Sequence, residues 1–339
     1  MNPTDDTRTA LPPGLWEDFS NGGRLACARL ISLIENEPVS RAAVRDRLLP
    51  RLGGAVRIGV TGPPGVGKST LTAGLAGRAL KAGRSVGIIA VDPTSPYTGG
   101  AFLGDRVRMH SLIGDPRVFI RSMAARDGRG GLSPAAPDAA DILDAFGLDR
   151  VFIETLGVGQ AELDIVACAD ILVLVLQPGT GDAIQILKAG IIETADLIVV
   201  NKTDMPGADS LLEALRFLFE AAGGTGKRSS PPLCMAAAAE DRGLDDVWSA
   251  LEILVARDRE SGRLREKRRL RLENEIRTAI SESLWERYLE LAGGTAEIAA
   301  AAERLIREGA SPYPFIRGER RRIKMTLDAN GTPLPKTKD

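Results

Sequence analysis

The strongest chemical pattern in the chain is the loop Gly62-Pro63-Pro64-Gly65-Val66-Gly67-Lys68-Ser69, which fits G-x-x-x-x-G-K-[ST] at every fixed position. The apolar run before it predicts a strand, and the residues after Lys68 predict a helix. Glycines let backbone N–H groups turn toward phosphates, Lys68 would reach the β- and γ-phosphates, and Ser69 would hold Mg²⁺. A chance glycine-rich turn is the alternative, but the flanking elements favour a nucleoside triphosphate site.

A second motif, Asn201-Lys202-Thr203-Asp204, follows the apolar run at 196–200 and predicts which base is bound. An ionised carboxylate only accepts hydrogen bonds, so Asp204 can take both N1–H and the N2 amine of guanine, a pair that adenine lacks. Asn201 would tie this loop to the phosphate loop, and the Lys202 stem would lie over the base. Four letters alone more often mark a polar turn, but the position after a strand favours guanine.

Three acidic residues stand where strands are predicted to end or in the loops beyond them: Asp92, Asp105 and Glu154. Carboxylates at the carboxyl ends of parallel strands can hold Mg²⁺ directly or through water. Each alone could equally be a surface acid or a helix cap. Their shared place at the phosphate edge predicts a metal site formed with Ser69.

The stretch Glu154-Thr155-Leu156-Gly157 stands where GTPases usually carry D-x-x-G, so the Gly157 N–H would bond the γ-phosphate. The glutamine that usually follows the glycine is Val158 here, and Gln160 lies three positions after Gly157. Because that glutamine normally orients the attacking water, we expect slow intrinsic hydrolysis that a partner or a second loop completes.

A further loop leads into a predicted helix that carries Asp182, Gln185 and Lys188 at spacings of three. Such residues line one helix face. On spacing alone, an exposed polar face is the favoured interpretation.

Composition narrows the classes that remain. The chain has 339 residues, 44% hydrophobic residues and a net charge of −1, so no strong attraction to nucleic acid or anionic membrane is expected. Three scattered cysteines predict a reducing compartment rather than a disulfide framework. The N-terminus lacks a signal pattern and no apolar run reaches about 18 residues. We therefore expect a cytoplasmic protein without a membrane span.

The apolar segments predict an α/β fold, a P-loop NTPase with a mostly parallel sheet covered by helices on both faces. Expected strands are 56–61, 85–91, 117–121, 150–154, 170–176, 196–200 and 232–236. Expected helices are roughly 69–82, 104–113, 138–146, 184–194, 208–222 and 243–257. The predicted domains are an N-terminal helical extension (1–52), the nucleotide domain (53–258), a C-terminal helical arm (259–316) and a flexible tail (317–339).

The arm is predicted as two amphipathic helices, Arg263 to Leu291 and about Thr295 to Glu308. Apolar residues recur at every fourth position in the first of them. A helical cap on the nucleotide domain would explain the pattern, but the length of the stripe favours an arm that pairs with a second subunit.

The segments GPPGVGKST, VDPTSPYTGGAFLGDRVRM, ETLGVGQAE and PGTGDAIQILKAGIIETADLIVVNKTD together resemble the MeaB/ArgK GTPases, also called methylmalonyl-CoA mutase-associated GTPases, over about residues 50 to 255. The resemblance implies a homodimeric SIMIBI-class GTPase that binds GTP or GDP with Mg²⁺. It also implies a chaperone for an adenosylcobalamin-dependent acyl-CoA mutase, which gates cofactor loading and protects the mutase.

The resemblance carries roles onto matching positions. It implies phosphate and metal contacts by Lys68, Ser69 and Thr70, metal-side acids at Asp92, Asp105 and Glu154, and guanine contacts by Asn201, Lys202, Asp204, Ala236 and Ala237. Asp182, Gln185 and Lys188 match the family's third switch, which supports hydrolysis together with Lys68 and Gln160.

Two segments depart from the family pattern. Residues 120–131 lack the prolines of its IRPSPSRGTLGG-type segment, and the usual serine before the guanine-loop alanine is absent from Cys234-Met235-Ala236-Ala237-Ala238. A GTPase metallochaperone is the main alternative, but one histidine and no CxxC argue against it. Asp204 argues against a transport-type ATPase, and a nucleotide-dependent interaction module that barely turns over remains open. Methylmalonyl-, ethylmalonyl- and isobutyryl-type mutases would look alike as partners.

Overall fold

The computed structural model describes residues 11–37, 40–92, 109–124, 132–155, 161–179, 191–222, 230–292 and 294–329. Two compact units divide the chain between Arg268 and Arg269. The first holds a parallel sheet with its covering helices, and the described residues of the second form helices joined by short connections. None of the described helices is both long and apolar enough to cross a lipid bilayer.

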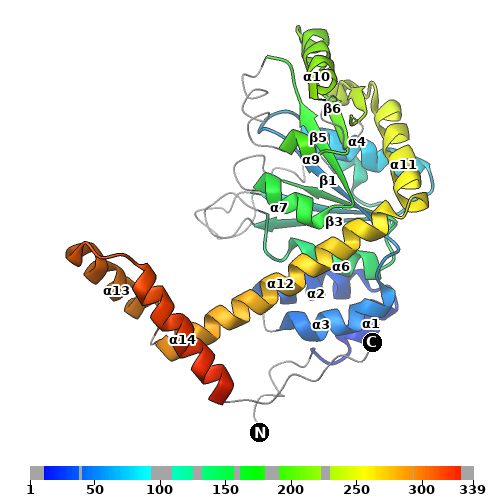
Figure 1. Ribbon diagram of the computed structural model, residues 1–339. Helices are drawn as coiled ribbons and strands as arrows, with labels where there is room; N and C mark the ends of the chain where they lie inside the picture. The colour runs from blue at the N-terminus through cyan, green and yellow to red at the C-terminus, as the bar shows by residue number, and fades with distance from the viewer. Residues whose placement is uncertain are drawn as a thin grey trace. The chain divides into compact units, whose positions relative to one another are not determined.

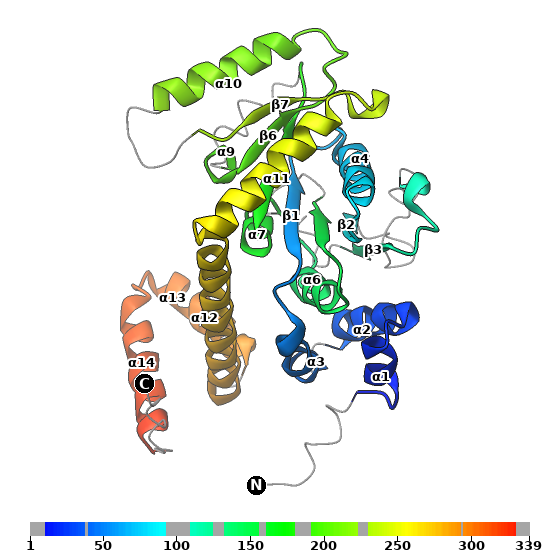
Figure 2. The ribbon, with the colours of Figure 1, turned by 90° about the vertical axis from the view of Figure 1, so that its right-hand side faces the viewer.

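The first unit is built on a seven-stranded parallel sheet in the order β3-β2-β4-β1-β5-β6-β7 (Figure 2). The strands are β1 (Val56–Thr61), β2 (Val86–Asp92), β3 (Val118–Ala124), β4 (Arg150–Glu154), β5 (Ile171–Leu176), β6 (Leu197–Val200) and β7 (Leu233–Met235). Each begins within one residue of its expected start, because parallel strands buried on both faces are continuous apolar runs. The expected fold class is confirmed.

Helices cover both faces of the sheet (Figure 1). One face carries α4 (Lys68–Lys81) and α11 (Leu244–Glu260), whose apolar residues share a core with β1. The other carries α2 (Arg24–Asn36) and α6 (Ala136–Ala145) over β2 and β4, and α9 (Ile191–Thr194) and α10 (Ala208–Ala222) over β5 and β6. On this second face α7 (Ala161–Cys168) packs so closely that a Cβ at Gly59 would lie 2.9 Å from the Ile165 side chain.

The N-terminal helices share the hydrophobic core of the sheet. α1 (Leu15–Ser20), α2 and α3 (Arg41–Leu48) bury Phe19, Leu30 and Leu48 in the cluster that includes α6. Ion pairs join α3 to α6, with Arg45 3.5 Å from Asp141. Three 3-10 turns complete the described elements: η2 (Leu49–Arg51), η3 (His110–Leu112) and η5 (Ala238–Glu240). Of the helices expected at 104–113 and 184–194, only η3 and α9 lie within the described residues.

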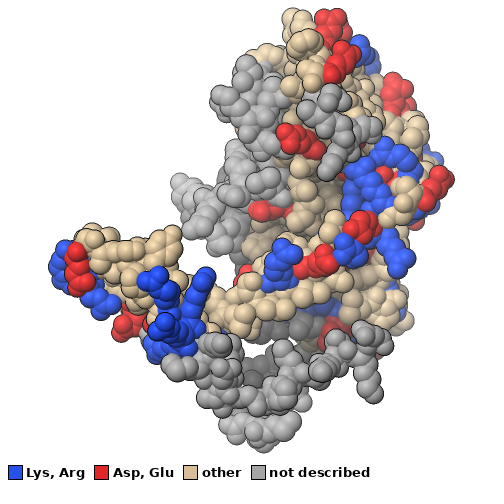
Figure 3. Space-filling view, in the orientation of Figure 1, with Lys and Arg blue, Asp and Glu red and all other residues tan. Residues whose placement is uncertain are grey.

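The second unit contains most of α12 (Arg263–Ala292), together with α13 (Thr295–Glu308) and α14 (Tyr313–Ala329). The prediction of a flexible tail from residue 317 onward is wrong for residues 317–329, which belong to α14. Phe315, Ile316 and Ile323 line one groove with α12 and α13 residues, so the apolar positions of this arginine-rich stretch lie on one helix face. The arginines of α14 are exposed, and Figure 3 shows Lys and Arg gathered over this helix.

Candidate functional site

The phosphate loop connects the carboxyl end of β1 to the start of α4. Its backbone needs glycine at Gly62, where φ is 141° and a Cβ would lie 2.1 Å from the Val175 carbonyl oxygen. The same holds at Gly67, where φ is 93° and a Cβ would lie 2.5 Å from Asn201 Nδ2. Glycine is therefore required where the loop packs against β5 and against Asn201, and glycine-rich loops of this kind bind phosphates through their backbone N–H groups.

Lys68 opens α4, and its side chain folds back over the loop. Its Nζ donates hydrogen bonds to the carbonyl oxygens of Gly62 at 3.0 Å and Pro63 at 2.9 Å, and the residue is buried. Thr70, two residues further along α4, is half-buried. The Lys68 ammonium therefore lies against the backbone of the loop itself.

Ser69 and Glu154 form the metal-side pair. The Ser69 hydroxyl donates a hydrogen bond of 2.5 Å to Glu154 Oε1, and both residues are buried. Glu154 ends β4, in register with Val60 of β1, so its carboxylate reaches the start of α4. Hydroxyl and carboxylate oxygens are what Mg²⁺ prefers, so this donor set fits the ion. Asp92 is the last residue of β2, but its side chain is not described, and Asp105 lies wholly outside the described residues.

Asn201 links the predicted base loop to the phosphate loop, as the sequence predicted. Its Nδ2 donates a hydrogen bond of 2.8 Å to the Val66 carbonyl oxygen, and its Oδ1 accepts one of 3.0 Å from the Ala238 N–H. Lys202 takes a left-handed φ of 58° and donates from Nζ to the Gly65 carbonyl oxygen at 2.7 Å. Asp204 is exposed, so its carboxylate is accessible to a base.

Ala236 and Ala237, predicted to contact guanine, are buried beside this loop. Their N–H groups already donate to the carbonyl oxygens of Val200 at 2.9 Å and Arg242 at 3.1 Å. The Ala236 carbonyl in turn accepts a hydrogen bond of 3.1 Å from the Thr203 N–H. The sequence did not predict a role for Thr203 or Ala238. Their backbone groups hold the two loops together, and backbone contacts leave no pattern of side chains in the sequence.

Neighbouring groups support this arrangement. Thr61 and Thr155 hydroxyls lie 3.2 Å apart where β1 and β4 end, a contact that the sequence analysis also missed.

Burial raises the pKa of the Cys234 thiol on β7, so this thiol stays protonated at neutral pH. Six predicted residues lie wholly outside the described part of the chain: Asp105, Gly157, Gln160, Asp182, Gln185 and Lys188.

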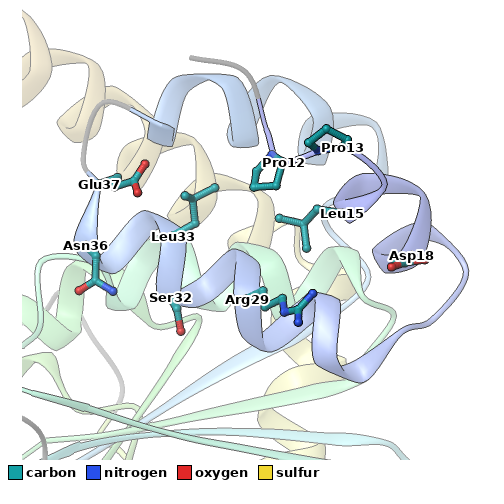
Figure 4. A pocket seen from close by; sticks show the side chains of 9 residues that line it. All are labelled: Pro12, Pro13, Leu15, Asp18, Arg29, Ser32, Leu33, Asn36 and Glu37. Carbon is teal, nitrogen blue, oxygen red and sulfur yellow. The ribbon is translucent and has the colours of Figure 1, made fainter. Parts of the chain in front are cut away.

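A separate hollow of about 300 Å³ lies on the N-terminal helices (Figure 4). Leu15, Leu33 and the two prolines Pro12 and Pro13 form its apolar part, with Arg29 among the polar residues that line it. It shares no residue with the phosphate loop, so it is not part of the candidate site.

Comparison with known proteins gives consistent matches. A family model described as methylmalonyl Co-A mutase-associated GTPase MeaB matches residues 27–292. A protein of Pyrococcus abyssi is 46% identical over 79% of this chain and 83% of its own length. The GTPase ArgK of Escherichia coli is 35% identical over 73% of this chain and 77% of its own. The crystal structure of an LAO/AO transport system kinase matches with a TM-score of 0.68 and 25% identity, over 94% of this chain and 99% of that one.

Proposed function

The chain belongs to the methylmalonyl-CoA mutase-associated GTPase family MeaB, and we propose that it is a cytoplasmic, GTP-hydrolysing chaperone of an adenosylcobalamin-dependent acyl-CoA mutase. In this role it would gate loading of the mutase cofactor and protect the mutase. The match of the family model over residues 27–292 supports the mutase association. The observation that carries the nucleotide part is the Asn201 side chain, which joins the predicted guanine loop to the phosphate loop.

Within this proposal the phosphates of GTP bind against the backbone of the loop from Gly62 to Gly67. Lys68 leaves the Gly62 and Pro63 carbonyl oxygens and takes the β- and γ-phosphates instead. This exchange replaces neutral acceptors with charged ones, so it strengthens the hydrogen bonds of the ammonium. The helix N-terminus at Lys68 adds partial positive charge at the same place.

Mg²⁺ would be held by Ser69 and Glu154, with Asp92 and Asp105 as further candidates, and it would neutralise charge that develops on the β- and γ-phosphates. Glu154 lies where it can accept the hydroxyl proton of Ser69 in a hydrogen bond and so orient the serine oxygen. Asp204 would accept from guanine N1–H and the N2 amine while Lys202 covers the base.

Gln160, Asp182, Gln185 and Lys188 are proposed to support hydrolysis, and Gly157 to bind the γ-phosphate, on the family resemblance alone. Because no glutamine follows Gly157 directly, this set would be completed when the mutase binds. Slow basal turnover with strong stimulation is the kinetic consequence.

We further propose that the chain is a homodimer through its C-terminal helices. Leu272, Ile276, Ile280 and Leu284 follow one another at four-residue spacing on α12, and each is 51–55% exposed. Leu284 and Trp285 also line an apolar groove of about 510 Å³ with α13 and α14 residues. Such a stripe is what a second helix covers. The test is the mass in solution by light scattering, where Ile276→Glu with Ile280→Glu should give a monomer.

The test of the function is GTP hydrolysis by the purified full-length protein, alone and with methylmalonyl-CoA mutase from the same organism. Slow basal turnover that rises at least tenfold with the mutase is expected. GTP hydrolysis that no acyl-CoA mutase changes would leave a GTPase and overturn the chaperone role. Equal binding of ATP and GTP would overturn the guanine assignment itself.

A further inference from the structure

Arg78 joins α4 by ion pairs both to the loop that follows β7, at Asp241, and to the first turn of α11, at Asp245. It lies in the last turn of the helix that carries Lys68 and Ser69, and its side chain is 8% exposed. Its guanidinium donates to both oxygens of Asp241, with Nη2 3.0 Å from Oδ2. It also donates to both oxygens of Asp245, at 3.1 and 3.2 Å. Two-point contacts of this kind fix direction as well as distance.

Asp241 is the residue at which the loop after β7 reverses direction. It takes a left-handed φ of 58°, which closes η5 and lets Ala237 and Arg242 form a two-way backbone bridge. The next glycine, Gly243, also has a positive φ, and a Cβ there would lie 2.2 Å from the Met235 carbonyl oxygen. The loop therefore has one tight shape, and Arg78 contacts it at its turning point.

This loop in turn holds the base-reading loop. The Ala238 N–H donates to Asn201 Oδ1, and the Ala236 carbonyl accepts from Thr203, the residue before Asp204. Asn201 then donates to Val66 in the phosphate loop, two residues before α4 begins. These contacts connect the last turn of α4, at Arg78, to the loop after β7. From there they run through Asn201 to Val66, just before the first turn of the same helix.

We propose that Arg78 is a positioning residue for guanine recognition, which acts through Asp241 to set where Asp204 meets the base. The inference rests on the guanine site proposed above. Asp245 belongs to the first turn of α11, and α11 already packs on α4, since a Cβ at Gly74 would lie 2.5 Å from Leu244 Cδ1. The ion pair with Asp245 therefore anchors α11, and the ion pair with Asp241 positions the loop that holds the base-reading loop.

The test compares GDP with inosine diphosphate, which lacks only the N2 amine that Asp204 accepts from. Both are measured by displacement of a fluorescent GDP from the full-length protein. The wild type should prefer GDP by about tenfold, the value of one hydrogen bond to a charged group. In Arg78→Gln and Asp241→Asn this ratio should fall to about twofold or less, because GDP loses its contacts through both N1–H and the N2 amine whereas inosine diphosphate has only the N1–H contact to lose.

Asp241→Asn is the safer variant, because asparagine tolerates a left-handed φ and the Asp241 side chain is 67% exposed. Asp245→Asn is the matched control and should keep the wild-type ratio. A ratio unchanged in both Arg78→Gln and Asp241→Asn, or lowered equally in Asp245→Asn, would overturn the proposal. A wild type with no preference for GDP would instead overturn the guanine site on which it rests.

Discussion

The Ser69 hydroxyl donates to Glu154 Oε1 across 2.5 Å, and so joins the first turn of α4 to the carboxyl end of β4. The two residues are 85 positions apart in the chain. This contact places a hydroxyl and a carboxylate together beside the phosphate loop, the donor set that a hard divalent cation requires.

Glu154→Gln should weaken the dependence of GDP binding on Mg²⁺. Glutamine keeps an oxygen that accepts from Ser69 but removes the negative charge, so the gain in GDP affinity on adding Mg²⁺ should shrink about tenfold. The measurement is the GDP dissociation constant with Mg²⁺ and with EDTA. Glu252→Gln is the control, since Glu252 pairs with Arg150 at 2.8 Å and is not among the proposed metal residues. An unchanged Mg²⁺ effect in Glu154→Gln would remove Glu154 from the metal site.

Asp204→Asn should move the base preference from guanine to xanthine. The amide presents an N–H where the carboxylate presented an oxygen, so it meets the N2 amine of guanine as a second donor but suits the C2 carbonyl of xanthine. The bond to the N2 amine becomes a clash between two donors and the bond to N1–H loses its charged acceptor, so GDP should lose about a hundredfold or more in affinity. Competition of GDP and xanthosine diphosphate against a fluorescent nucleotide measures both. Because Asp204 is exposed, the melting temperature should stay unchanged.

Gly74 and Gly77 lie on the same helix, α4, and should respond oppositely to alanine. A Cβ at Gly77 meets nothing within 4 Å, so Gly77→Ala should raise the free energy of unfolding by about 0.5–1 kcal/mol through helix propensity. A Cβ at Gly74 would lie 2.5 Å from Leu244 Cδ1, so Gly74→Ala should lower it by about 1–3 kcal/mol through overpacking. Urea unfolding of the two variants decides the matter. Stabilisation by Gly74→Ala would mean that the Leu244 side chain moves away from Gly74 without cost, so that the two helices do not pack tightly at this point.

The sequence predicted those parts of the fold and site that depend on local chemistry. The strands were found because apolar runs such as Ile171–Leu176 are buried on both faces. The Asn201 link was predicted because its motif implies one geometry. The helix at Tyr313–Ala329 was missed because arginines separate its few apolar residues and hide their period.

Long-range contacts could not be predicted in the same way. Arg78 and Asp241 are 163 residues apart, and neither belongs to a motif. Their contact depends on how α4 and α11 cross on one face of the sheet, which no local pattern encodes. The same holds for Ala238 and Thr203, whose backbone groups act whatever side chains they carry.

The carboxyls of Asp241 and Asp245 should titrate at lower pH than ordinary aspartates. Hydrogen bonds from the Arg78 side chain hold the pKa of each carboxyl below its usual value. For a carboxyl whose folded-state pKa is lowered, the stabilising contribution is present above the unfolded-state pKa of about 3.9 and is lost as pH falls through the folded-state pKa. The contact should therefore persist at neutral pH and break only in acid.

Carbon-detected NMR titration of the two side-chain carboxyls measures this directly. In Arg78→Gln both pKa values should return toward the ordinary aspartate value, because the charged donor is gone. Asp115, which is paired with Arg117 at 2.8 Å, serves as an internal control whose lowered pKa should not move in that variant. If the Asp241 pKa is ordinary in the wild type, the ion pair with Arg78 does not form in solution. The base-reading loop would then be held by Asn201 and the backbone alone.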